Sequence, residues 1–295
     1  MNNEKIEELI QYPLFKSITG SHLYGTFTDE SDLDYLGFIL PPVDVLIGIY
    51  NFERKQKFFE QDGENIDLII YSLKRFIELI IKGDPKNTEV LFNENCYFKN
   101  KKIKELINIL KKDVVSNKFY KAVMGFSNSQ WRKAMVTTKT YKYEPVKTRL
   151  KKLNNLVKSC NLNKDEKKQI KNILGKKIDS KIISSYDKME ERRQKEFDKY
   201  GYCLKNAMHS IRLLEEVEEF LRTGNIIFPR PNANVLLSIR KGKLLRNEVI
   251  KEYNNIREKA EGSINKSVLR DKPKTENVWK FYKKFVLNYI NYNHI

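Results

Sequence analysis

Cysteine and histidine are scarce in this chain of 295 residues, and each scarcity excludes a class of site. The three cysteines, Cys96, Cys160 and Cys203, are odd in number and lack the C-x-x-C spacing of zinc and redox centres. We therefore expect reduced thiols in a cytoplasmic protein, without a disulfide framework. No Ser-His-Asp set is evident, and no Gly-Lys-Ser/Thr occurs anywhere, which excludes a complete P-loop.

Long hydrophobic runs are also missing. No apolar stretch approaches the ~18 residues of a membrane span. Leu9 and Ile10 lead straight into Gln11-Tyr12-Pro13, so no signal-peptide pattern begins the sequence. We expect no membrane partner. A hydrophobic content of 40% is nevertheless enough for a globular core, and the length suits one large domain or two ordinary ones.

Acidic residues are outnumbered, with 56 Lys and Arg against 38 Asp and Glu, a net charge of +18. A basic surface attracts polyanions, so nucleic acid is the partner that the charge favours. A lysine-rich compositional bias, with abundant Asn and Ile, is the alternative explanation. Residues 147–199 hold 17 Lys and Arg against 8 Asp and Glu, a net +9, and this basic segment either contacts RNA or is a solvated helix.

Hydrophobic periodicity predicts an α+β fold. The expected strands are Phe15–Thr19, Asp32–Leu40 and Ile66–Ile70, and the next helix starts near Ser72 and ends at Gly83. Beyond about Lys101 the periodicity is helical, with helices expected over Tyr202–Arg222, within Ala233–Ala260 and over Asn277–Tyr292. We expect a catalytic α/β domain over residues 1–105 and a helical domain, containing the basic segment, over residues 106–295.

Three aspartates are candidate metal ligands. Asp32 and Asp34 are two residues apart, so in a strand their side chains share one face with Cα atoms about 6.5 Å apart. That separation suits a pair of divalent ions about 3.5–4 Å apart. Asp67 stands in an apolar strand, where a cation would compensate a buried charge; the alternative is an edge-strand acid that faces water.

Gly20 and Ser21 follow the first expected strand and offer a second chemical group. Glycine permits close approach of the backbone, and serine adds a hydroxyl and free N–H donors, which together suit a triphosphate. His22 comes next and either contacts phosphate or packs beside Tyr24. The glycine–serine turn and the acids together predict metal-dependent chemistry on a nucleotide.

Lys205, His209 and Arg212 occupy positions i, i+4 and i+7 of one expected helix. At about 100° per residue they fall within an arc of about 60°. Three potential cations on one stripe suit a triphosphate or a nucleic-acid backbone. An ordinary solvated helix face is the alternative.

The pattern Gly20-Ser21-x10-Asp32-x-Asp34, with a later strand aspartate at Asp67, resembles the nucleotidyltransferase superfamily of DNA polymerase β. Two longer strings, GSHLYGTFTDESDLDYLGFILPP from residue 20 and YGYCLKNAMHSIRL from residue 200, are more specific. They resemble the RNA-ligase-associated, RlaP-like branch that is common in bacteria and phages. Residues 101–199 carry no motif that matches.

The resemblance implies a two-metal reaction that moves a nucleoside monophosphate from a nucleoside triphosphate to an acceptor hydroxyl. It implies that Asp32, Asp34 and Asp67 bind two Mg²⁺ ions, with Mn²⁺ as a substitute, and that Gly20, Ser21 and His22 meet the triphosphate. Lys205, His209 and Arg212 would face the same cleft. RNA is the favoured acceptor; a protein or small-molecule hydroxyl and a non-catalytic RNA-binding role are the alternatives. The nucleotide and the oligomeric state stay open.

Overall fold

The structure is a computed structural model that describes residues 2–29, 31–135 and 193–292, together with residues 155, 163, 165, 166 and 191. The basic segment 147–199 therefore lies mostly outside the described residues. Within the described part, no helix has both the length and the apolar character needed to cross a membrane.

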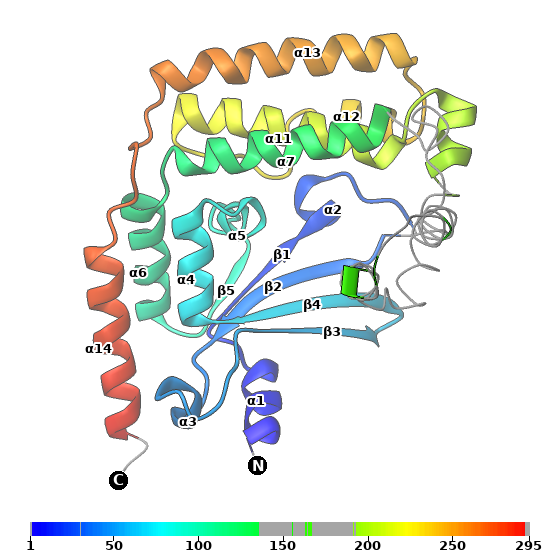
Figure 1. Cartoon of the computed structure of the whole chain (residues 1–295). Helices are drawn as coiled ribbons and strands as arrows, with labels where there is room; N and C mark the ends of the chain where they lie inside the picture. Colours follow the sequence, from blue (N-terminus) through cyan, green and yellow to red (C-terminus); the bar gives the residue numbers. More distant parts are fainter. Residues whose placement is uncertain are drawn as a thin grey trace.

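A five-stranded mixed sheet forms the N-terminal half (Figure 1). Its strands are β1 (Phe15–Thr19), β2 (Leu33–Ile39), β3 (Arg54–Gln61), β4 (Glu64–Ser72) and β5 (Cys96–Phe98). Their spatial order is β3-β4-β2-β1-β5, with β2 and β4 parallel and the other neighbours antiparallel. The three expected strands are confirmed as β1, β2 and β4, whereas β3 and β5 were not predicted.

Helices surround the sheet and make up nearly all of the C-terminal half (Figure 1). They are α1 (Asn2–Gln11), α2 (Gly20–Tyr24), α3 (Val43–Leu46), α4 (Leu73–Lys82), α5 (Pro85–Glu89), α6 (Lys101–Ile109), α7 (Lys118–Met135), α11 (Leu204–Thr223), α12 (Ala233–Arg240), α13 (Arg246–Ser263) and α14 (Glu276–Tyr292). The π-helical turn Leu110–Val114 extends α6, and a 3₁₀ turn, Ile264–Lys266, extends α13. The α+β class is confirmed.

Alternation along the strands divides the hydrophobic residues between two sheet faces. Leu36 and Phe38 of β2 belong to the main core, which the α4, α6, α7 and α11 side chains complete. Ile39, on the opposite face, belongs to a smaller cluster that Ile6 and Ile10 of α1 cover. The two expected domains thus share the main core, because that core contains residues from both sides of the boundary at residue 105.

Short polar and glycine signals set the helix boundaries next to the sheet. The Ser72 hydroxyl accepts a hydrogen bond from the Arg75 N–H and caps α4, which ends where Gly83 adopts a φ of 78°. Asp84 caps α5 in the same way by accepting from the Asn87 N–H. These caps turn the chain back sharply, so that α5 lies beside the end of the sheet that carries the candidate site.

Candidate active site

The structure brings the three aspartates together on one face of the sheet. Asp34 of β2 lies directly beside Asp67 of β4 in the parallel register. Asp32 lies immediately before β2, and its negative charge acts on Asp34. That face also carries Leu36 and the main core, so the acids lie where the core ends and the sheet opens to solvent.

The three carboxylates interact electrostatically. Burial raises the pKa of Asp34 above its ordinary value, and the negative charges of Asp67 and Asp32 raise it further. Lys86 of α5 and Lys205 of α11 act in the opposite direction. A partly desolvated acid beside two like charges is a site that a cation would stabilise.

Asp67 already has a partner on the neighbouring strand. The side-chain amide of Gln56 on β3 donates to both carboxylate oxygens of Asp67, at 2.8 and 2.9 Å. Among the described residues, no group of three or more His, Cys, Asp or Glu side chains has an arrangement that could hold a metal ion as it stands. The three carboxylates nevertheless supply the oxygen ligands that Mg²⁺ prefers, and Gln56 is a neutral donor that a cation can displace.

Gly20 fits directly against the Asp34 carboxylate. A Cβ at Gly20 would lie 1.9 Å from Oδ2 of Asp34, and the backbone φ is +69°. Thr19, the preceding residue, lies opposite Asp34 in the β1–β2 register. The Ser21 carbonyl accepts from the Thr26 N–H at 2.9 Å, which closes the turn after β1. A side chain at residue 20 is therefore excluded by both the backbone conformation and the neighbouring acid.

We expect Gly20→Ala to reduce the activity of this site about 100-fold, because the new methyl group would push the Asp34 carboxylate out of position. The left-handed backbone should add a loss of about 1–2 kcal/mol in the free energy of unfolding. Gly48→Ala is the matched control, since Gly48 has a φ of +87° and open space around its Cβ position. Equal activity losses in the two variants, measured by steady-state kinetics, would contradict this account of Gly20.

His22 packs against an aromatic ring, but not that of Tyr24. Its imidazole stacks on Phe27 with ring centroids 4.7 Å apart and an interplanar angle of 6°. The Nε2 atom is buried and has no hydrogen-bond partner in the structure. This unpartnered nitrogen lies one residue after the glycine–serine turn.

The three side chains of the expected cationic stripe occupy different environments on α11. Lys205 is exposed and, with Arg240 and Lys241, lines a cavity of about 540 Å³. Burial, together with the positive charges of Arg212, Lys205 and Arg240, lowers the pKa of His209 to about 3. His209 is therefore neutral at pH 7. The expectation of three cations on one face is corrected: only Lys205 presents its charge to solvent.

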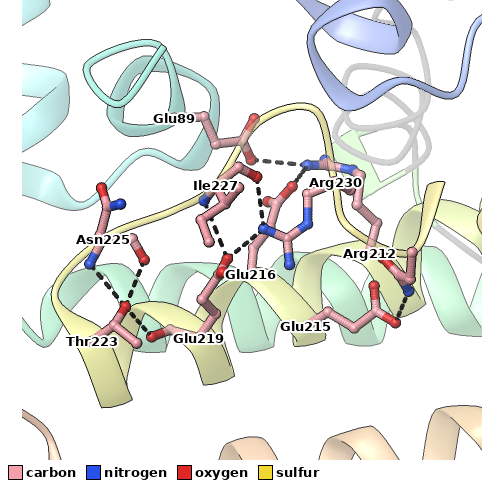
Figure 2. A network of polar contacts seen from close by, with 10 residues as sticks. Glu89, Arg212, Glu215, Glu216, Glu219, Thr223, Asn225, Ile227 and Arg230 are labelled. Atoms are coloured by element: carbon pink, nitrogen blue, oxygen red, sulfur yellow. Dashed lines mark hydrogen bonds and ion pairs between the residues drawn. The ribbon is translucent and has the colours of Figure 1, made fainter. Parts of the chain in front are cut away.

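Arg212 is buried in a network of ion pairs (Figure 2). Its guanidinium binds Glu216 one turn along α11 and lies 3.3 Å from Oε1 of Glu89 on α5. The same group lies over the Tyr24 ring, 3.6 Å from its centroid, and the Tyr24 hydroxyl donates to Glu89. Arg212 therefore connects α11 to α5 and α2 inside the protein.

The network continues through a second arginine (Figure 2). Arg230, in the loop after α11, binds Glu219 and also donates to the Ile227 carbonyl at 3.1 Å. Glu215 accepts from the Asn232 side chain. The network therefore contains two arginines, Arg212 and Arg230, and more carboxylates than arginines. The four carboxylates belong to Glu89, Glu215, Glu216 and Glu219.

Glu215 makes stability depend on pH. Burial raises its pKa to about 7 from an ordinary value of 4.5. The folded protein therefore favours the protonated acid, so stability is greatest below the unfolded pKa and is lost as pH rises through about 7. Converted at 1.36 kcal/mol per unit, the loss by pH 8 is at most about 3 kcal/mol.

We expect Glu215→Gln to remove this pH dependence, because an amide stays neutral and keeps an oxygen for Asn232. In urea unfolding, the variant should match the wild type at pH 5 and exceed it at pH 8. Glu218→Gln is the control on the same helix, since Glu218 contacts the exposed Arg222. A variant with an unchanged pH profile would show that Glu215 is ionised in the folded protein at neutral pH.

Sequence reasoning missed four residues of this site. Gln56 and Phe58 of β3 lie beside Asp67, and Lys86 of α5 lies near Asp34. Glu89 contacts Arg212, which is 123 positions away in the sequence. The Asp62-Gly63 pair, a common hairpin turn, was the signal that could have revealed β3.

Comparison with known proteins identifies the family of this chain. Residues 4–268 match the family model RlaP, described as an RNA repair pathway DNA polymerase beta family. An uncharacterised 38.9 kDa protein of Enterobacteria phage T4, from the nrdC-mobD intergenic region, is 40% identical over 81 residues. That alignment covers 26% of this chain and 24% of the phage protein.

Among solved structures, a nucleotidyltransferase-like protein from Exiguobacterium sibiricum matches 90% of this chain and 73% of its own, at 10% identity and a TM-score of 0.28.

Proposed function

The chain belongs to the RlaP family of the DNA polymerase beta nucleotidyltransferases, and from this premise we propose that it transfers a nucleoside monophosphate from a nucleoside triphosphate to a hydroxyl at the end of an RNA. The acceptor oxygen forms a bond to the α-phosphorus, and the bond from that phosphorus to the α–β bridging oxygen breaks. Pyrophosphate leaves, and the hydroxyl proton goes to a carboxylate or to solvent.

The register of Asp34 beside Asp67, with Gly20 against Asp34, is the observation that carries this proposal. Asp32, Asp34 and Asp67 would hold divalent ions, Mg²⁺ or Mn²⁺, which when bound lower the pKa of the acceptor hydroxyl and offset charge on the pyrophosphate. Asp67 would also take the proton of the acceptor hydroxyl, once the Gln56 amide no longer binds the Asp67 carboxylate.

The glycine–serine turn would hold the other reactant. Gly20 lets the backbone approach the β- and γ-phosphates, and Ser21 adds a hydroxyl, so the α-phosphorus is held in line for attack. His22 follows this turn and would contact the same phosphates only if its buried Nε2 became exposed. These residues adjoin Asp34, so the triphosphate would lie on the β1 side of the acids.

In this proposal Lys205, His209 and Arg212 of the helical half have three different roles. Lys205 keeps the nucleotide-binding role, because it is exposed and its charge reaches Asp34. His209, being neutral, would contribute only a hydrogen bond. Arg212 acts from inside the protein, since its ion pairs with Glu89 and Glu216 hold α11 in place.

RNA is proposed as the acceptor because of the net charge of +18 and because of the family's place in RNA repair. A basic protein that neutralises several phosphates releases counterions, so RNA binding should weaken steeply between low and moderate salt. The cavity beside Lys205, Arg240 and Lys241 is a place where such phosphates could lie.

The test is to incubate the protein with each α-³²P-labelled nucleoside triphosphate, Mg²⁺, and either total cellular RNA or total cellular protein. We expect label in the RNA fraction with the wild type and none with Asp34→Asn. Label confined to the protein fraction would refute the RNA acceptor but keep the transferase. No label from any nucleotide in either fraction would refute the reaction.

A further inference from the structure

Phe58 of β3 is the most prominent unexplained residue beside the acids. Its side chain is 75% exposed and belongs to neither hydrophobic core. It lies directly opposite Asp67 in the antiparallel β3–β4 register. Opposed residues of an antiparallel pair project to the same face, so Phe58 and Asp67 are neighbours on the catalytic side of the sheet.

The register extends this pair into a row across four strands. Thr19 lies opposite Asp34, Asp34 lies beside Asp67, and Asp67 lies opposite Phe58. Neighbouring strands are about 4.8 Å apart. The proposed triphosphate site, at the turn after Thr19, is therefore at one end of the row, and an exposed aromatic ring is at the other.

A cavity of about 400 Å³ lies at the Phe58 end of this row. Phe58, Glu60, Asn65 and Asp67, which share one face of the β3–β4 hairpin, line it together with Asp32, Phe59 and Ile66. The cavity thus combines an aromatic surface with carboxylates and an amide. A flat apolar group fits against the aromatic side chains of this cavity.

We propose that this cavity binds the terminal nucleotide of the acceptor strand, with its unpaired base stacked on Phe58 and its terminal hydroxyl beside Asp67. Aromatic stacking is the general means by which proteins hold unpaired bases. Asn65 and Glu60 offer polar groups to the edge of the base. The backbone of the strand would leave the cavity towards the basic parts of the protein.

This inference rests on the proposed function, since a terminal nucleotide is the occupant only if the acceptor is a nucleic acid. The overall charge of +18 favours that occupant over an acidic or neutral peptide. In this arrangement the triphosphate lies at the Thr19 end of the row and the acceptor nucleotide at the Phe58 end. The triphosphate and the acceptor therefore do not compete for the same surface.

The experiment compares Phe58→Ala with the wild type on two RNA oligonucleotides, one with a normal 3′ nucleotide and one ending in an abasic nucleotide. Phe58→Ala should raise the KM for normal RNA about 5- to 100-fold and leave the KM for the nucleoside triphosphate unchanged. The abasic end should weaken wild-type binding, measured by fluorescence anisotropy without nucleotide, by a similar factor. It should not weaken binding to Phe58→Ala further.

Two further variants control for structure. Phe58→Tyr keeps an aromatic ring and should restore the wild-type KM for RNA. Phe126→Ala removes another exposed phenylalanine, on α7, and should change neither KM. RNA labelling with an unchanged KM for RNA in Phe58→Ala would overturn this inference alone. If only protein is labelled, and if the abasic end does not change RNA binding, both this inference and the proposal that RNA is the acceptor are overturned.

Discussion

Asp34→Asn is expected to abolish nucleotide transfer while leaving the protein at least as stable as the wild type. The loss should be about 10⁴-fold or more, as for other residues that act within a catalytic unit. Asn keeps the size of the side chain but removes the charge that would hold a divalent ion. Activity measured with labelled nucleotide, and unfolding measured by urea titration, should therefore change independently.

The stability half of this prediction follows from the raised pKa of Asp34. Burial, more than any other cause, disfavours the charged form in the folded protein. An acid with a raised pKa destabilises the fold increasingly as pH rises through that value, so Asn should give its largest gain at alkaline pH. The neutral Asn removes the free-energy cost of burying the Asp34 charge in the folded protein.

Asp44→Asn is the control, because Asp44 lies in the short helix α3 instead of on the catalytic face. It should keep wild-type activity. Asp32→Ala and Asp67→Asn should resemble Asp34→Asn in activity. An Asp34→Asn protein that retained a tenth of wild-type turnover would remove Asp34 from the proposed mechanism.

Arg212→Ala is expected to produce the largest loss of stability, about 3–5 kcal/mol in the free energy of unfolding. The substitution leaves Glu89 and Glu216 buried without their cation. It also removes the group that covers the Tyr24 ring. Urea unfolding monitored by circular dichroism would measure the loss.

Lys205→Ala provides the contrast on the same helix. Lys205 is exposed, so its removal should change stability by less than about 0.5 kcal/mol but weaken nucleotide binding. Adding Glu216→Gln to Arg212→Ala should restore part of the stability by removing one of the unpaired charges. Breaking a buried ion pair should cost more than about 1 kcal/mol. If the free energy of unfolding of Arg212→Ala lies within that range of the wild type, the buried carboxylates are protonated in the absence of the arginine.

Local signals explain why much of the N-terminal half could be predicted. The strand Phe15–Thr19 agrees with β1 in both bounds, and the Ser72 cap and the Gly83 end of α4 agree as well. Each of these features depends on residues within a few positions of one another. The register that sets Asp34 beside Asp67 did not follow from such signals, because it depends on the pairing of two strands that are distant in the sequence.

Two features depended on information that local patterns do not carry. β3 alternates weakly because most of its side chains are exposed; only the Asp62-Gly63 turn, with φ values of 55° and 80°, indicates a hairpin there. The spacing of Lys205, His209 and Arg212 correctly placed them on one helix. It could not show that Glu89, from another helix, meets Arg212 in the core.

The Arg212 network also limits how the molecule can move. One guanidinium joins α11 to α5 and α2, so a swing of α11 away from the sheet would separate buried charges at a cost of several kcal/mol. The main core crosses the same boundary and adds to that resistance. We therefore expect α11 to keep a fixed position while substrates bind and leave, without a hinge between the two halves.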